Sequence, residues 1–218
     1  MFRPRIAVPA IVIGLLFATA CQAQPTQQSA KPPPKLDNIP TGMQAALFAG
    51  GCFWCMEAPF DKIPGVLSTT SGYTDGFVKD PAYRKVANGE TGHTEAVQIV
   101  FDPKKVTYEK LLYVFWRNID PTAKDRQFCD GGTQYRSGVY AYGQEQLTAA
   151  RGSLDAIKKS GVVKETIYTE IKPATRFYAA ETYHQDFYKK NPAHYYRYRT
   201  GCGRDARLKL IWGDQAGG

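Results

Sequence analysis

The stretch AALFAGGCFWCME, residues 45–57, contains the change from strand to helix around which the fold is expected to form. Residues 45–49 are a short apolar run, which is typical of a buried strand, and the glycine pair Gly50-Gly51 ends that run. Residues 53–62 indicate a short helix that ends before a Pro-Gly pair. The sequence therefore places Cys52 at a strand-to-helix turn, immediately before the helix.

Strands and helices alternate along the rest of the chain, judged by the period of their apolar residues. Further strands are expected at 66–70, 95–101, 138–142 and 166–171. Further helices are expected at 108–119, 144–160 and 181–190. Thr107 is expected to cap the first of these helices, and Gly161 is expected to end the second.

This order of elements predicts an α/β fold, a two-layer sandwich with a mixed sheet and a ferredoxin-like core. The glycine-containing segment Thr200-Gly201-Cys202-Gly203 lies near the C-terminus. We expect this segment to be flexible and to wrap toward the site formed around Cys52.

Residues 1–23 have the three-part pattern of a secretory signal. Arg3 and Arg5 supply its positive end, residues 11–17 supply a short apolar run, and small residues follow. The apolar run is too short to span a bilayer as a permanent helix. We therefore expect an exported protein, located in the periplasm or the cell envelope.

Ala20-Cys21 also resembles the end of a bacterial lipobox, so a membrane tether through a lipidated Cys21 stays open as an alternative. Residues 24–44 are rich in proline and glutamine and are predicted to be a tether. Residues 45–213 have the length of one domain.

The formal net charge of +8 suits acidic partners or a solubilising surface. Without a basic helix or a nucleic-acid motif, we expect no nucleic-acid binding, and we expect a monomer.

Cys52 has the surroundings of a reactive thiolate. A helix start offers free N–H groups and partial positive charge, both of which lower the pKa of a thiol. Phe53 and Trp54 follow directly and would form an aromatic wall, which suits an apolar methyl or sulfur group. The alternative is a small buried thiol between two core aromatics.

Four cysteines follow Cys21, and their number leaves two other functions open. Cys52-Phe53-Trp54-Cys55 fits the Cys-x-x-Cys pattern of thiol–disulfide oxidoreductases, although the order of the residues around it is unusual for that class. An even number of cysteines is also typical of structural disulfides in exported proteins. A tethered envelope protein that binds peptides in an aromatic groove would fit that pattern, with two permanent disulfides.

GCFWCME, residues 51–57, resembles the signature of the A class of peptide methionine sulfoxide reductases. Other stretches of that family follow in the same order, and the resemblance covers nearly all of residues 45–201. They are Ser71-Gly72-Tyr73, Pro81-x-Tyr83-Arg84-x-Val86, Gly92-His93-Thr94-Glu95-Ala96-Val97, Asp130-x-Gly132-Thr133-Gln134-Tyr135-Arg136-Ser137 and Ala180-Glu181-x-Tyr183-His184-Gln185.

The resemblance implies thiol-dependent reduction of methionine S-sulfoxide to methionine, in proteins and as the free amino acid. Cys52 would attack the sulfoxide sulfur and become a sulfenic acid, and Glu95 would donate a proton to the oxygen. A buried carboxyl suits this role because burial raises its pKa. The remaining assignments are Phe53 and Trp54 around the methyl group, Tyr83 and Tyr135 as hydrogen-bond donors to the oxygen, and Asp130 as support for the site.

A sulfenic acid condenses with a second thiol, so a resolving cysteine is expected. Cys202 is favoured, because the family often keeps this cysteine in a C-terminal tail that can move to the active site. Cys55 and Cys129 are the alternatives. A thioredoxin-like partner would then reduce the disulfide.

No cofactor is expected, because thiols supply the electrons. No metal site is expected either, because His93, His184 and His194 do not have the spacing of metal ligands.

Overall fold

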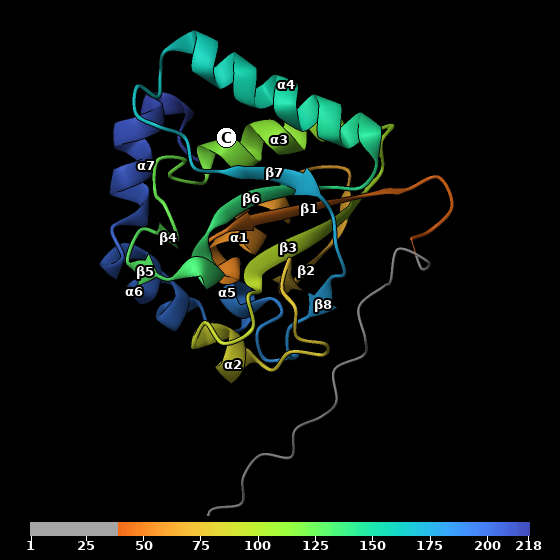
Figure 1. Ribbon diagram of the computed structural model, residues 1–218, viewed down its shortest axis with the longest axis vertical. Coiled ribbons are helices and arrows are strands. Elements are labelled where there is room, and N and C mark those ends of the chain that lie inside the picture. The colour runs from red at the N-terminus through yellow and green to blue at the C-terminus, as the bar shows by residue number, and fades with distance from the viewer. Residues whose placement is uncertain (1–38) are drawn as a thin grey trace, which may run out of the picture.

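The computed structural model describes residues 39–218. The predicted signal at 1–23 and the tether up to residue 38 lie outside the described residues. A six-stranded sheet with the order β7-β6-β1-β3-β2-β8 forms one layer, and helices α1, α3 and α4 form a second layer (Figure 1). Strands β6 and β7 run parallel and the other neighbours run antiparallel, which confirms the predicted mixed sheet.

The bounds of the elements are as follows. The strands are β1 (Gln44–Gly50), β2 (Val66–Thr74), β3 (Thr94–Phe101), β4 (Arg126–Gln127), β5 (Asp130–Gly131), β6 (Ser137–Ala141), β7 (Glu170–Pro173) and β8 (Tyr178–Ala179). The helices are α1 (Phe53–Phe60), α2 (Tyr83–Ala87), α3 (Tyr108–Arg117), α4 (Gln144–Ser160), α5 (Phe187–Lys190), α6 (Pro192–Gly201) and α7 (Arg204–Trp212). Strands β4 and β5 form a separate pair.

The main core lies between the sheet and its helices. The Phe48 ring of β1 stacks on Phe60 of α1 and on Phe115 of α3, with ring centroids 5.5 Å and 5.0 Å apart. All three side chains are fully buried, and each such burial stabilises the fold by about 1.5–3 kcal/mol. Because Phe48 lies between the two helices, it fixes where α1, and therefore Cys52, lies on the sheet.

Several predicted elements are confirmed, together with their ends. The Thr107 hydroxyl accepts a hydrogen bond of 3.2 Å from the backbone N–H of Lys110, so Thr107 caps α3. Gly161 ends α4 in the left-handed conformation, with φ of 67°. The pattern of apolar residues and caps therefore located the elements that build the core.

Two predicted elements are shorter than expected. The strand at 166–171 begins only at Glu170, because the paired part of β6 begins opposite it, at Gly138, and residues 166–169 have no strand to pair with. The helix at 181–190 begins only at Phe187. Asp186 is left-handed, with φ of 54°, and its backbone N–H donates to the buried carboxylate of Glu57, so the helix cannot extend through it.

The C-terminal segment differs most from expectation. Instead of a flexible tail, residues 192–212 form α6 and α7, which Gly203 separates in a left-handed turn with φ of 65°. Leu208 and Trp212 are buried, and the Trp212 indole N–H donates to the Ile119 carbonyl at 3.0 Å. The segment does reach the site around Cys52, as predicted, but as packed helices. Among residues 39–218, none of the helices is long and apolar enough to cross a lipid bilayer.

Candidate active site

Cys52 is the residue immediately before α1, and only 6% of it is exposed. The turn from β1 into α1 requires a glycine at position 51. Gly51 has φ of 79°, and a Cβ atom there would lie 2.5 Å from the Cβ of Gln127. The predicted strand-to-helix turn is confirmed, and it holds the thiol inside the protein rather than at its surface.

Glu95, from β3, lies at the same helix start. Its Oε2 accepts a hydrogen bond of 3.0 Å from the backbone N–H of Phe53, and 2% of the residue is exposed. Burial raises the pKa of Glu95 to about 8, although the hydrogen bond from Phe53 opposes the shift. At neutral pH Glu95 is therefore mostly protonated, which is the state that a proton donor needs.

Cys52 and Cys55 are free, buried thiols that belong to the same cluster of side chains. Burial raises the pKa of Cys52, and the hydrogen bond with Cys55 and the charges of Cys55, Glu95 and Asp130 raise it further. The hydrogen bond from Cys52 lowers the pKa of Cys55 to about 6. The predicted lowering of the Cys52 pKa is thus wrong, because burial dominates and Glu95 occupies the N–H group at the helix start. At neutral pH the two sulfurs share one negative charge and one proton.

Phe53 and Trp54 form the predicted aromatic wall, and His184 holds both rings in place. The Trp54 indole N–H donates to Nδ1 of His184 at 3.1 Å, and the Phe53 ring centroid is 4.9 Å from that of His184. Burial lowers the pKa of His184 to about 4, so its ring is neutral and Nδ1 can accept. On its other side, Trp54 stacks on Phe187 with centroids 3.7 Å apart. The wall is therefore rigid.

Tyr83 and Tyr135 are half-buried hydroxyl donors at the site. Burial raises the pKa of both, to about 12 for Tyr83, and the charges of Glu95 and Cys52 raise both further. Glu181 orients the first of them by accepting from the backbone N–H of Tyr83 at 2.9 Å. Both hydroxyls keep their protons at neutral pH and can donate them in hydrogen bonds.

Asp130, from β5, lies beside α6. The Tyr198 hydroxyl of α6 donates a hydrogen bond to Asp130 Oδ2, and the Tyr198 ring packs on Trp54 with centroids 5.9 Å apart. Burial raises the pKa of Asp130, and the hydrogen bond from Tyr198 opposes that shift. Asp130 therefore links the loop before η2 (Thr133–Tyr135) to the C-terminal helices that cover the site.

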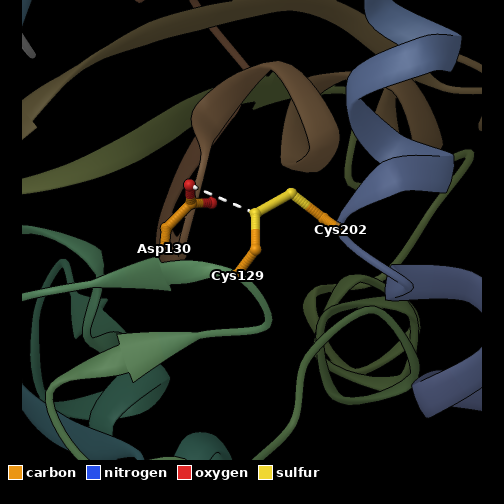
Figure 2. A group of neighbouring side chains, drawn as sticks. All are labelled: Cys129, Asp130 and Cys202. Atoms are coloured by element: carbon orange, nitrogen blue, oxygen red, sulfur yellow. Dashed lines mark hydrogen bonds between the residues drawn. A yellow bond between two sulfur atoms is a disulfide. The ribbon is translucent and has the colours of Figure 1, made fainter.

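Cys129 and Cys202 are joined by a disulfide (Figure 2), with their Cα atoms 4.9 Å apart. Cys129 is exposed, and its Sγ lies 3.6 Å from Oδ1 of Asp130. Cys202, predicted to resolve Cys52, is bonded to Cys129 instead, and its role as the resolving cysteine stays a prediction. One disulfide beside two free thiols does not match the two permanent disulfides of a peptide-binding module.

The structure brings all the predicted site residues together at one end of the sheet, and it adds three that the sequence analysis gave no role. His184 and Glu181 hold Trp54 and Tyr83, and Tyr198 holds Asp130. The first two lie within the family stretch 180–185, which was the available signal. No pattern pointed to Tyr198, because its partner lies 68 positions away in the chain.

Comparison with known proteins gives a consistent result. The family "Peptide methionine sulfoxide reductase" matches residues 44–216. The chain is 50% identical to peptide methionine sulfoxide reductase MsrA of Bacillus subtilis over 170 residues, which cover 78% of this chain and 96% of the relative. It is 49% identical to MsrA 2 of Caulobacter vibrioides over 172 residues, 78% of this chain and 86% of the relative.

Solved structures agree with the sequence relatives. Methionine sulfoxide reductase A of Corynebacterium diphtheriae superposes with a TM-score of 0.67 at 36% identity, covering 70% of this chain and 76% of that chain. Reduced Mxr1 of Saccharomyces cerevisiae gives 0.67 at 31% identity, covering 77% of this chain and 93% of that chain. These matches give no support to a thiol–disulfide oxidoreductase. The chain belongs to the A class of the peptide methionine sulfoxide reductases, and its activity is the thiol-dependent reduction of methionine sulfoxide to methionine.

Proposed function

We propose that Cys52 is the nucleophile of this reductase and Glu95 its proton donor, acting on methionine S-sulfoxide. The observation that carries the assignment is the hydrogen bond of 3.0 Å between Glu95 and the backbone N–H of Phe53. This bond holds the Glu95 carboxyl, which is mostly protonated at neutral pH, next to Phe53, the residue that follows Cys52. The Phe53 and Trp54 rings next to them suit the methyl group of the substrate.

The first step transfers two electrons from the Cys52 sulfur to the sulfoxide. The Cys52 thiolate attacks the sulfoxide sulfur while Glu95 gives its proton to the oxygen, on which negative charge develops. Tyr83 and Tyr135 donate hydrogen bonds to the same oxygen. The oxygen then passes to Cys52, which becomes a sulfenic acid, and methionine leaves.

Cys55 has two roles in this proposal. Its lower pKa makes it the thiolate of the resting pair, so it can take the proton of Cys52 and leave the charge on the nucleophile. It is also the thiol already in contact with Cys52. Its sulfur then attacks the sulfenic sulfur, a Cys52–Cys55 disulfide forms, and water leaves. The two thiols supply both electrons, so the reaction balances without a cofactor.

Recycling requires a reductant, and we propose that it reaches the enzyme through Cys129 and Cys202. Cys52 and Cys55 are 6% and 1% exposed, which keeps a protein-sized thiol donor away from them. Cys129 is exposed and bonded to Cys202. When reduced, this pair can pass its electrons inward by thiol–disulfide exchange, and a thioredoxin-like protein can reduce it again. Cys202 thus acts in the second step rather than the first.

A stoichiometry measurement tests this sequence of steps. The protein is reduced fully, freed of reductant, and given excess methionine sulfoxide peptide, and the methionine formed is counted. Two disulfides can form, so about two methionines per protein are expected. The matched variant Cys129→Ser with Cys202→Ser should form about one, because it retains only the first pair. About one methionine from the unaltered protein, as from the variant, would show that the outer pair takes no part.

We also propose that the protein works in the periplasm or the cell envelope. The support is the basic and apolar pattern of residues 1–23, followed by a proline-rich stretch. Cell fractionation tests this location, with Cys21→Ala as the variant that separates the two modes of export. Release of the variant from membranes would indicate a lipid tether at Cys21. Recovery of the unaltered protein in the cytoplasm would contradict the proposal.

A further inference from the structure

Arg204, at the first position of α7, is a buried cation directly behind the catalytic turn. It is 2% exposed. Its Nη2 donates to the carbonyls of Gly50 and Asn118, both at 2.8 Å, and its guanidinium lies over the Phe128 ring, 4.3 Å from the centroid. A Cβ atom at Gly51 would lie 3.8 Å from Arg204 Nη1. The guanidinium therefore packs against the two glycines that precede Cys52.

Among residues 39–218, Arg204 has no carboxylate within the 4.0 Å of an ion pair. Its Nε is buried and finds no hydrogen-bond partner. Its other contacts are neutral: carbonyls, the Met56 sulfur at 3.2 Å and an aromatic ring. A buried cation is unfavourable without an anion nearby. Asp130 meets this need only in part: the charge of Arg204 acts to lower the pKa of Asp130, but the two form no ion pair.

We propose that Arg204 is a positioning residue whose fixed charge balances the single negative charge that Cys52 and Cys55 share. This inference rests on the proposed function, in which that charge is the nucleophile. The geometry supports it, because the guanidinium touches the backbone of the turn that places both thiols. In agreement, the positive charge of Arg204 contributes to the lowered pKa of Cys55.

The other charges around the thiols leave this role to Arg204. Glu95 and Asp130 oppose a thiolate, and both raise the pKa of Cys52. Arg199 favours a thiolate but forms an ion pair with Asp205, which offsets its charge. The remaining titratable groups that face the pair are neutral hydroxyls, those of Tyr83, Tyr135, Tyr195 and Tyr198. Among the described residues, Arg204 is thus the buried cation at the site that forms no ion pair, although its charge also favours the ionised form of Asp130.

Two substitutions separate the charge of Arg204 from its hydrogen bonds. Arg204→Gln keeps an N–H donor for the carbonyls but removes the charge, whereas Arg204→Lys keeps the charge and loses the planar group. Arg207→Gln is the matched control, since Arg207 lies in the same helix but pairs with Asp120, at 2.7 Å, and is partly exposed. The readout is the rate of iodoacetamide alkylation of Cys52 and Cys55 against pH, without substrate. Peptide mapping assigns the label, and the Cys129–Cys202 disulfide is kept intact.

The midpoint of alkylation should rise by about one pH unit or more in Arg204→Gln, with about a tenfold lower rate near neutral pH. Arg204→Lys and Arg207→Gln should keep the midpoint of the unaltered protein. A lower melting temperature in Arg204→Gln with an unchanged midpoint would overturn the proposal and show a purely structural role. If Arg204→Gln does not fold, Arg204→Lys tests the proposal instead. Because Arg204→Lys keeps the charge, a raised alkylation midpoint in that variant also overturns the proposal. Methionine formation by the unaltered protein tests the proposed function separately.

Discussion

At the start of α1, one carboxyl and one thiol have opposite requirements, and the site meets both. Glu95 needs its proton to act as a donor, and burial keeps it there by raising its pKa to about 8. Cys52 needs to lose its proton, and the same burial opposes this. In the proposed mechanism Cys55 resolves the conflict, because it accepts the Cys52 proton. Helix position alone therefore does not set the reactivity of Cys52.

Glu95→Gln tests the proton donor. Glutamine keeps the size of the side chain and can still accept from the Phe53 N–H, but it cannot give up a proton to the sulfoxide oxygen. The single-turnover rate of methionine formation should fall by about 100-fold or more. In the unaltered protein the single-turnover rate should decline as pH rises through about 8, because Glu95 then loses the proton that it donates. That decline should be absent in the variant, and a variant with the full rate and the same pH profile would refute the role of Glu95.

His184→Phe tests the support of the aromatic wall. Phenylalanine keeps a ring beside Phe53 but removes the acceptor of the Trp54 indole N–H. A buried donor left without a partner costs about 1–3 kcal/mol, which urea denaturation would measure. The KM for a methionine sulfoxide peptide should rise more than kcat falls, because in the proposed mechanism the wall binds the methyl group. An unchanged KM would show that Trp54 does not depend on His184.

At the scale of elements, the sequence predicts correctly those strands and helices that depend on local patterns of residues. The strand before Cys52, the helix capped by Thr107 and the helix ended by Gly161 all depend on apolar period and caps, and all were predicted. The ends of β7 and α5 were not, because they depend on where β6 begins and on the distant carboxylate of Glu57. The helices α6 and α7 were missed, since glycines at 201 and 203 suggested flexibility and the packing of α7 on Ile119 is not visible in sequence.

In the site, too, some features could be predicted from the sequence and others depend on the folded structure. The roles proposed for Cys52, Glu95 and the aromatic pair were predicted from the family resemblance. The sharing of a proton between Cys52 and Cys55 could not be predicted, because it depends on how deeply both thiols are buried. The bond between Cys129 and Cys202 could not either, since it joins residues 73 positions apart.

Gly51→Ala tests the turn between β1 and α1. The new Cβ would meet Gln127 at 2.5 Å, and the left-handed φ of 79° would be strained. The free energy of unfolding should fall by about 1–3 kcal/mol, and activity should fall with it because the Cys52 backbone shifts. Gly152→Ala is the control, since a Cβ within α4 would meet nothing within 4 Å. That change should stabilise the protein by about 0.5–1 kcal/mol. Equal effects of the two changes would contradict this account of the turn.

At the scale of the whole molecule, buried acids link stability to pH. Glu57 is 1% exposed, and burial raises its pKa from the ordinary 4.5 to about 7, although the N–H of Asp186 opposes the shift. The folded state therefore holds this proton more tightly than the unfolded state. The resulting contribution to stability is complete below pH 4.5 and is lost as pH rises to about 7.

Glu57→Gln isolates this effect, because glutamine can accept from the same N–H and does not ionise. The difference in unfolding free energy between the two proteins should change by about 2–3 kcal/mol in favour of the variant as pH rises between these values. Urea denaturation at a series of pH values measures it. Glu145→Gln, at an exposed position of α4, is the control and should show no such trend. A difference that is constant with pH would mean that the pKa of Glu57 is the same in the folded and unfolded states.

The central claim is that Cys52 takes the sulfoxide oxygen and that Cys55 then removes it. The measurement that tests it most directly is a single turnover with a methionine S-sulfoxide peptide, followed by mass spectrometry of the protein with a sulfenic acid trap. The Cys55→Ser variant should form methionine and keep a trappable sulfenic acid on Cys52, whereas Cys52→Ser should form no methionine. Methionine formation by Cys52→Ser, or a Cys52–Cys202 disulfide in the otherwise unaltered protein after its first turnover, would contradict the account.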